Sequence, residues 1–340
     1  MNNKITFSAY LTFFIFSAWI MAFVLSGCDE SSSKNIIHSS HPDIDQITEQ
    51  IVSDPNNAIL YFNRAKLYYE YGKFDHVILD MEFAMAKDSL NPDFYHLLAD
   101  AYLDYYNSRA ALNTMNKVLA LYPERIASLL KMAELKHILQ DYDGSILTVN
   151  EVVRIDPQNA EGYFMLGVNF REQNDKKRAT NAFQTAVEMD SGLTDAWIFL
   201  GELYEENNDP LALKYFESAI ISNPNSMEAL HAKAYYLQNH ENINQAQEIY
   251  RKIIVTDKNY SDAYLNSGIL YLEADSLDKA YEQFDLLTTI EPTNHMGFYM
   301  RGIIHEKKGQ KEAALSDYKS SLNLNKNDKN VLKAIEILEK

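Results

Sequence analysis

The chain has 340 residues, only 11 glycines and 8 prolines, and a formal net charge of −17 at pH 7. Because helix-interrupting residues are scarce, the composition favours a largely helical protein. The negative charge argues against binding to DNA or RNA, whose phosphates it would repel, and favours basic or apolar partner surfaces. Cys28 is the only cysteine, which excludes a disulfide within the chain and a metal cluster held by cysteines.

Residues 1–27 are predicted to be a targeting segment. Lys4 supplies a weak positive charge, and the apolar run from Ile5 to Leu25 is long enough either to span a bilayer or to act as a secretory signal. The residues Leu25-Ser26-Gly27-Cys28 then resemble the lipobox of bacterial lipoproteins, in which small residues precede a lipidated cysteine. The resemblance implies cleavage before Cys28 and a lipid anchor in the bacterial cell envelope. The alternative is a cysteine that merely ends a transmembrane helix.

Residues 28–43 are predicted to form the lipidated cysteine and a flexible tether, because they are rich in Ser, Asn and His and poor in apolar residues. Residues 44–57 are predicted as an N-terminal capping helix, with Ile44, Ile47 and Ile51 on one face. Asp29, directly after the cysteine, resembles an inner-membrane retention signal of enteric bacteria. Other phyla read this region differently, so the sequence leaves open whether the inner or the outer membrane holds the anchor.

A pattern of two amphipathic helical segments recurs from Ala58 onward with a regular period of about 34 residues. Eight such repeats fill residues 58–327, and only the repeat at Thr194 is shorter, by a single deletion in the turn between Asn207 and Pro210. The repeats begin at Ala58, Pro92, Ile126, Ala160, Thr194, Met227, Ser261 and His295.

Each repeat places large and small residues at fixed positions. The fourth residue of most first helices is aromatic, as in Tyr61, Tyr163 and Trp197, and the residue four later is small. A larger side chain there would push the two helices of a hairpin apart. The small residues of the first helices are Ala65, Ala99, Ala133, Gly167, Gly201, Ala234, Gly268 and Gly302. Large residues of the second helices are Met81, Met115, Val149, Phe183, Phe216, Tyr250, Phe284 and Tyr318.

The period and these columns resemble the tetratricopeptide repeat family. The resemblance implies an all-α fold, a right-handed α-solenoid of tandem helical hairpins, which serves as a scaffold for protein or peptide partners. Residues 328–340 are predicted as a C-terminal capping helix, with Val331, Leu332, Ile335 and Leu338 on its apolar side.

In this family the first helices line a concave groove that binds a peptide or a helix. Aromatic and aliphatic residues alternate there with acids, which suits a partner that offers apolar anchors and Lys or Arg. The alternative is binding by the convex face, the loops or an edge. The groove positions carried over to this chain are Phe62, Lys66, Tyr69, His96, Asp100, Leu130, Glu134, Phe164, Val168, Arg171, Ile198, Glu202, Glu205, His231, Leu265 and Tyr299.

No arrangement of residues predicts an enzyme, a cofactor or a metal site. The histidines are scattered, with no HExxH motif, and there is no glycine-rich loop for phosphate. The run from Asp141 to Gly144 suggests the start of a calcium loop, but further ligands and the closing Glu are missing. The same run fits the turn between two helices of a repeat.

Taken together, the sequence predicts a membrane-anchored scaffold that binds protein or peptide partners in the bacterial cell envelope, as in the assembly of an envelope machine. Two other functions stay open. One is a structural protein whose repeats associate with further copies of the chain; the other is a regulatory subunit of an envelope enzyme.

Overall fold

The structure is a computed structural model that describes residues 41–340. The predicted signal segment and Cys28 lie outside the described residues. Two compact units divide the chain, one ending at Thr114 and the other running from Met115 to Lys340. Each is described by itself below.

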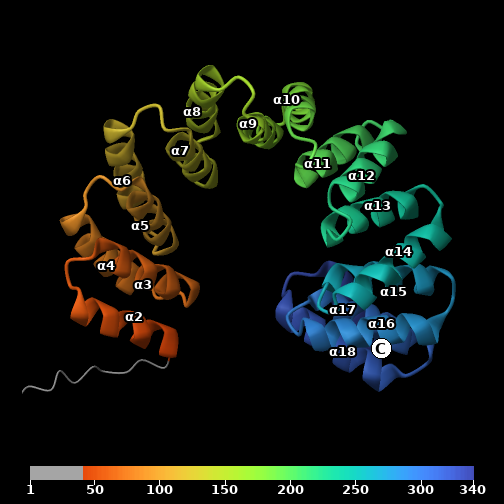
Figure 1. Cartoon of the computed structure of the whole chain (residues 1–340). Helices are drawn as coiled ribbons and strands as arrows, with labels where there is room; N and C mark the ends of the chain where they lie inside the picture. Colours follow the sequence, from red (N-terminus) through yellow and green to blue (C-terminus); the bar gives the residue numbers. More distant parts are fainter. Residues whose placement is uncertain (1–40) are drawn as a thin grey trace, which may run out of the picture. The chain divides into compact units, whose positions relative to one another are not determined.

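The described residues form 18 α-helices joined by short turns (Figure 1). The predicted all-α fold of tandem helical hairpins is confirmed. The odd-numbered helices from α3 to α17 begin at the eight residues that start the repeats in the sequence, and the even-numbered helices are their partners. The helices are α2 (Pro42–Ser53), α3 (Ala58–Glu70), α4 (Phe74–Lys87), α5 (Pro92–Asp104), α6 (Ser108–Leu121), α7 (Ile126–Ile138), α8 (Tyr142–Ile155), α9 (Ala160–Glu172), α10 (Lys176–Met189), α11 (Thr194–Glu205), α12 (Leu211–Ser222), α13 (Met227–Asn239), α14 (Ile243–Thr256), α15 (Ser261–Glu273), α16 (Leu277–Ile290), α17 (His295–Lys307), α18 (Lys311–Leu324) and α19 (Lys329–Glu339).

The aromatic residue near the start of a first helix ties that helix to the turn before it. The Tyr95 hydroxyl donates a hydrogen bond to the Ser89 carbonyl at 2.8 Å, and Nε1 of Trp197 donates to the carbonyl of Ser191 at 2.9 Å. The same bond, to the equivalent carbonyl of the preceding turn, is made by the hydroxyls of Tyr61, Tyr163 and Tyr264. These residues therefore fix the turn between repeats in addition to filling space.

Inside the hairpins, the small residue of the first helix faces the large residue of the second. A Cβ atom added to Gly268 would lie 2.5 Å from the ring of Phe284. Repeats with alanine at this position can carry smaller partners, as in the buried pair Ala65 and Met81. The other glycines that lie this close to an aromatic ring are Gly167 on Phe183, Gly201 on Phe216 and Gly302 on Tyr318. Hairpin packing thus matches the two columns in size in seven of the eight repeats, the exception being Ala234, which faces the buried Tyr250.

Each hairpin turns through one residue in the left-handed backbone region. The residue is glycine in only two repeats, although glycine alone adopts this conformation without steric cost. All eight occupy the same position of their repeats: Gly72, Tyr106, Gln140, Asn174, Asn208, Glu241, Asp275 and Gly309. The geometry of the hairpin therefore imposes this conformation regardless of the residue type.

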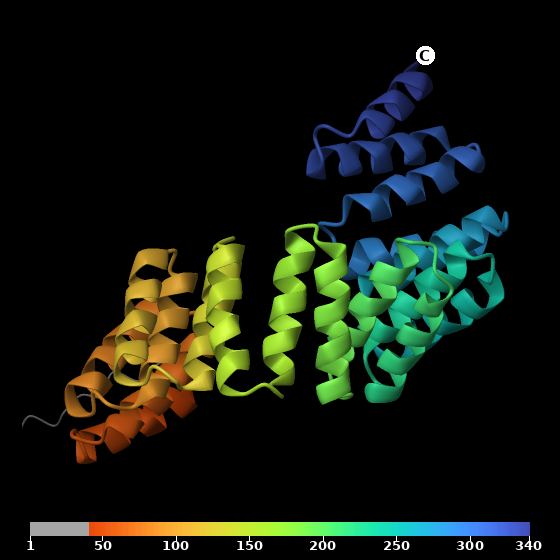
Figure 2. The same ribbon diagram turned by 90° about the horizontal axis from the view of Figure 1, so that it is seen from above.

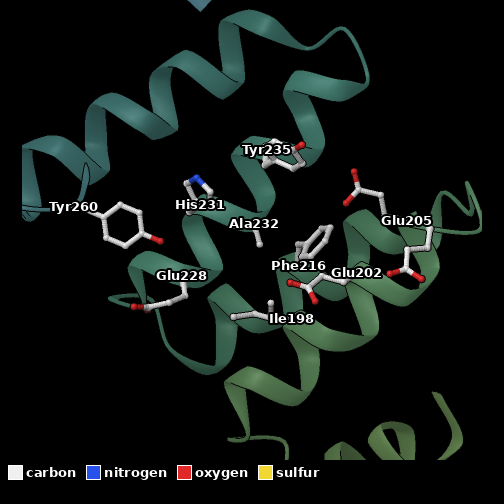
Figure 3. Close-up of a pocket in the computed structure, with 10 residues that line it drawn as sticks. Ile198, Glu202, Glu205, Phe216, Glu228, His231, Ala232, Tyr235 and Tyr260 are labelled. Carbon is white, nitrogen blue, oxygen red and sulfur yellow. The ribbon is translucent and has the colours of Figure 1, made fainter. Parts of the chain in front are cut away.

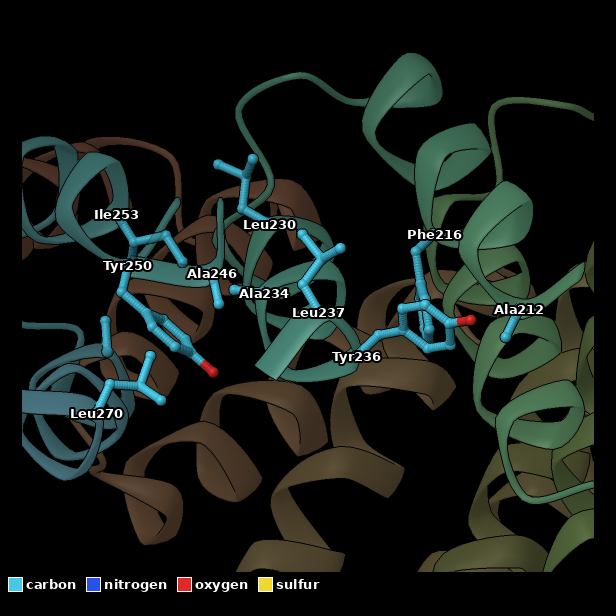
Figure 4. Packing of buried hydrophobic residues seen from close by; sticks show 11 residues of the cluster. Ala212, Phe216, Leu230, Ala234, Tyr236, Leu237, Ala246, Tyr250, Ile253 and Leu270 are labelled. Carbon is cyan, nitrogen blue, oxygen red and sulfur yellow. The ribbon is translucent and has the colours of Figure 1, made fainter. Parts of the chain in front are cut away.

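In the unit from Met115 to Lys340, consecutive helices from α9 to α13 pack side by side (Figure 2). Buried residues of α12 to α15 form one shared core (Figure 4). The ring of Phe216 on α12 lies 5.8 Å from that of Tyr236 on α13, and Tyr250 of α14 is buried with its hydroxyl donating to Gln238. This core holds α11, α12 and α13 in the positions that shape the site described below.

An arginine joins three helices near the end of the array. Arg301 of α17 forms ion pairs with Asp317 of α18 at 2.7 Å and with Asp285 of α16 at 2.6 Å. Hydrogen bonds to both carboxylates raise the pKa of the Arg301 guanidinium, so it stays charged.

Helix α19 packs on α18 through the buried Val331, and it carries Glu336 where the first helices have the small contact residue.

Candidate functional site

A pocket of about 510 Å³ lies between α11, α12 and α13 in the second unit (Figure 3). Its volume is within the range of pockets that hold small ligands or side chains of a partner. The pocket is lined by Ile198, Glu202, Glu205, Glu206, Phe216, Glu228, His231, Ala232, Tyr235 and Tyr260.

Helical spacing places the lining residues on facing sides of two first helices. Ile198, Glu202 and Glu205 lie one and two turns apart on α11, so they share one face. His231 and Tyr235 are likewise one turn apart on α13. Four of the residues predicted for the groove, Ile198, Glu202, Glu205 and His231, are thus brought together in one pocket.

The floor of the pocket is apolar. Ile198 is 6% exposed and Phe216 is 1% exposed. Ala232 lies between the acidic and the aromatic sides (Figure 3). Because Phe216 also packs against Gly201 within its hairpin, the floor is part of the core and is rigid.

One wall of the pocket is aromatic and uncharged. The ring of His231 lies 5.7 Å from that of Tyr260 and is stacked on that of Tyr235. Burial lowers the pKa of His231, opposed by Asp262. Nε2 of His231 lies 2.9 Å from the amide nitrogen of Asn266, from which it can accept a hydrogen bond. Burial also raises the pKa of Tyr260 to about 12, so the wall carries no charge at neutral pH.

Four carboxylates line the pocket, three of them on α11 and its C-cap and one, Glu228, beside Tyr260. Two of them are paired within the protein, Glu202 with Arg171 at 3.0 Å and Glu206 with Lys176 at 2.8 Å. Partial burial raises the pKa of Glu202; Arg171 opposes this shift, and the carboxylates of Glu206 and Glu205 add to it.

The remaining two carboxylates, Glu205 and Glu228, form no ion pair with a residue in the range 41–340. Glu205 accepts a long hydrogen bond from the Asn239 amide at 3.4 Å. Glu228, in the first turn of α13, accepts a hydrogen bond from the Ser226 hydroxyl at 2.9 Å. The pocket therefore has two carboxylates that a bound cation can neutralise.

The predicted groove residues of α9 lie in the preceding repeat, where Phe164 and Val168 are partly buried and Arg171 is exposed. The Phe164 ring is stacked on that of Phe199 at 5.9 Å, and the Arg171 guanidinium lies 4.3 Å from the centre of the same ring. Val168 is half-buried against the same cluster. On α7, Leu130 is buried, and Glu134 pairs with Lys131 at 3.0 Å. None of these residues lines the pocket.

Other predicted groove residues lie in the unit that ends at Thr114. Nζ of Lys66 lies 4.7 Å from the centre of the Phe62 ring, and that ring packs on Phe94 at 5.1 Å. His96 and Asp100 are half-buried on α5. These positions make up a separate surface, which is described only within its own unit.

Sequence reasoning missed several residues of the pocket. Tyr235 occupies the position of Glu202 in the next repeat, and comparison of the repeats could have found it. Tyr260 precedes α15, and Phe216 is a core residue of a second helix, so neither belongs to the exposed face of a first helix. The sequence alone therefore gives no indication that Tyr260 and Phe216 line the pocket; only the folded structure shows it.

No metal site or spanning helix is found among residues 41–340. No three of their His, Cys, Asp and Glu side chains group closely enough to hold a metal ion, and none of the helices is both long and apolar enough to cross a bilayer. In the suspected calcium loop, the Asp141 side chain accepts a hydrogen bond from the Gly144 amide at 3.0 Å, as expected of a helix N-cap.

Comparison with known proteins agrees with the repeat pattern. Family models described as tetratricopeptide repeat match residues 164–226 and residues 297–328. The mitochondrial import receptor subunit TOM70 of Homo sapiens is 24% identical over 326 residues, which are 91% of this chain and 53% of the receptor. The DnaJ homolog subfamily C member 7 homolog of Schizosaccharomyces pombe is 22% identical, with 84% of this chain and 60% of the relative covered. The chain thus spans little more than half the length of these relatives.

Solved structures show the same fold at low sequence identity. The crystal structure of the APC/C hetero-tetramer Cut9–Hcn1 covers 89% of this chain and 60% of its own matched chain, with a TM-score of 0.57 and 15% identity. A tetratricopeptide repeat protein from Parabacteroides merdae covers 73% of this chain and 99% of its own, with a TM-score of 0.54 and 15% identity. Residues 164–226 and 297–328 are thus tetratricopeptide repeats by their family matches, and the remaining helical hairpins share the fold of the solved structures.

Proposed function

We propose that this protein is a lipid-anchored scaffold of the bacterial cell envelope that binds a basic, partly apolar segment of a partner protein. The observation that carries the proposal is the pocket between α11 and α13, where an apolar floor lies between an aromatic wall and carboxylates. Peptide-binding surfaces combine apolar anchor pockets with complementary charge in this way.

Apart from Phe216, the pocket residues are not those that the repeat requires. Tyr61, Gly201 and their equivalents hold the hairpins together, through the hydrogen bonds and close contacts described above. Glu205, Glu228 and Tyr235 make no such contribution, and Tyr235 is 45% exposed. A partly exposed aromatic ring beside unpaired carboxylates is better explained by binding than by folding.

The anchor rests on the sequence around Cys28. Two or more acyl chains on this residue would hold the protein at a membrane without a spanning helix. The predicted tether, which would end where α2 begins at Pro42, would then keep the repeats clear of the bilayer. In this arrangement the scaffold holds its partner at the membrane surface, as the assembly of an envelope machine requires.

Site-specific photo-crosslinking in the native bacterium tests the binding surface. A photoreactive phenylalanine analogue at Tyr235 should crosslink a partner, and the same analogue at Ile221, which is 79% exposed on a second helix, should not. Replacing Glu202 and Glu205 with Lys should weaken the crosslink, because the reversed charge repels a basic segment. A partner captured through Ile221 and insensitive to the charge reversal would place binding on the other face.

The lipid anchor has its own test. Cys28→Ser should abolish incorporation of radiolabelled palmitate and partitioning into the detergent phase. Labelling that is unchanged in this variant would remove the lipoprotein part of the proposal, without affecting the binding surface.

A further inference from the structure

We infer that the pocket between α11 and α13 receives an arginine side chain of the partner protein. The inference rests on the proposed function and specifies the residue that the scaffold recognises. Its support comes from the chemistry of the lining and from a comparison of this pocket with the preceding repeat.

The preceding repeat already holds a guanidinium at the equivalent place. Arg171 of α9 lies with its guanidinium 4.3 Å from the centre of the Phe199 ring and 3.0 Å from the carboxylate of Glu202, both on α11. The protein therefore uses an aromatic face and a carboxylate to hold an arginine between two successive first helices.

In the pocket, the same three positions are occupied differently. At the equivalent positions of the next repeat, Phe199 is replaced by Ala232, Glu202 by Tyr235 and Arg171 by Glu205. The exchange of a phenylalanine for an alanine opens the cavity, and the exchange of an arginine for a glutamate removes the internal cation. The result is a site in which an aromatic ring and carboxylates remain but the cation is not supplied by the residues that line it.

The carboxylates lie on both sides of the aromatic wall. Figure 3 shows Glu228 beside Tyr260 and His231 at one end of the pocket and Glu205 at the other end. A guanidinium suits this arrangement, because its planar face stacks on aromatic rings while its five donors point outward in a fork. It is also less strongly hydrated than the compact ammonium of lysine, so entry over the apolar floor costs less.

A direct titration tests the recognition. N-acetyl-arginine methylamide, added to the full-length protein in detergent and followed by calorimetry, should bind about tenfold more tightly than the citrulline analogue, which has the same shape without the charge. The double variant Glu205→Gln/Glu228→Gln should show a similar loss. Equal binding of the citrulline analogue, or tighter binding of the lysine analogue, would overturn the inference.

Matched variants distinguish binding in the pocket from a general attraction of the arginine to negative charge on the protein. Glu161→Gln/Glu172→Gln removes two exposed carboxylates from α9, and Glu161 occupies the same repeat position as Glu228; this variant should bind as the wild type does. Ala232→Phe restores the residue of the preceding repeat and should fill the cavity, with loss of binding at an unchanged thermal midpoint. Binding that survives Ala232→Phe in a folded protein would contradict the assigned pocket.

A random heptapeptide library displayed on phage tests whether the arginine belongs to a protein segment. Selected peptides should contain an arginine next to an apolar residue and should lose binding to Glu205→Gln/Glu228→Gln. If the selected peptides bind at Tyr235 but contain no arginine, the proposed scaffold function is retained and the inference of arginine recognition fails. If no peptide is selected while the free arginine analogue binds, the site recognises a small guanidinium compound, and the assignment to a partner protein is wrong.

Discussion

The contact between Gly268 and Phe284 allows a sharp test of the hairpin packing, through the substitution Gly268→Ala. In an exposed helix interior this change stabilises the protein by about 1 kcal/mol, because alanine has the higher helix propensity. Here the new Cβ atom would lie 2.5 Å from Cε1 and 2.8 Å from Cζ of the Phe284 ring. The ring is fully buried against Ala280 and Ile304 and cannot swing aside.

Overpacking of this kind costs about 1–3 kcal/mol. After the gain in helix propensity, the expected net effect is a loss of about 1 kcal/mol in the free energy of unfolding. The sign of the change therefore reports whether the two helices touch at this position. Urea unfolding followed by circular dichroism measures the total, and native-state hydrogen exchange in α15 and α16 shows whether the loss is local.

A second substitution, Phe284→Met, completes a double-mutant cycle that measures the coupling between the two residues. Phe284→Met produces the pairing seen for Ala65 and Met81, so the double variant Gly268→Ala/Phe284→Met should be more stable than the sum of the single changes predicts, by about 1 kcal/mol. A Gly268→Ala variant that is more stable than the wild type, with additive effects in the double variant, would refute the size matching of the two columns.

Three further predictions address the turns, the ion pairs and the pocket. Glu241→Gly should raise the free energy of unfolding by about 1 kcal/mol, because Glu241 has a φ of 62° in its turn. Gly309→Ala should lower the free energy of unfolding, because it places a side chain at a positive φ. Thermal unfolding of both variants should therefore show changes of opposite sign in stability. Arg301→Met should cost about 3–5 kcal/mol in urea unfolding, since it leaves the buried carboxylate of Asp317 without its partner, and an unchanged midpoint would contradict the role of the ion pair. Burial raises the pKa of Glu202 above its ordinary value, so its protonated form favours folding at low pH, and this contribution is lost as the pH rises through the raised pKa. Affinity for the arginine analogue should change in the opposite direction and fall as the pH drops through the raised pKa, and Glu202→Gln should reduce this pH dependence.

The hairpin core could be predicted because the repeat supplies eight examples of each contact. Tyr163, Gly167 and Phe183 recur at fixed spacing, and steric limits between two packed helices allow few alternatives at these positions. The left-handed turn residues could not be predicted, because residues such as Tyr106 and Gln140 carry no preference for positive φ. Their conformation follows from closing the hairpin, and it appears only when the helices are in place.

The candidate site was predicted in part for a related reason. Ile198, Glu202 and Glu205 share one face of a single helix, so periodicity alone placed them together. Tyr260 comes from the turn before α15 and Phe216 from the paired second helix, and their convergence depends on packing between repeats. Leu130 occupies the same repeat position as Ile198 and is buried to a similar extent, but it does not line the pocket. A helical face in the sequence thus does not show which of its residues line a pocket.

Comparing the repeats with one another distinguishes residues needed for folding from residues available for binding more clearly than comparing them with a family pattern does. Positions at which every repeat needs a particular size, such as that of Gly201, cannot vary without cost to stability. Positions such as that of Ala232 vary freely, and the exchange from Phe199 to Ala232 changes a filled contact into an open pocket. The loss of the internal arginine at Glu205 accompanies that exchange, so the cavity and its charge arise together. This coincidence of shape and charge in one repeat is the reason to assign the binding function to α11 and α13 and not to the array as a whole.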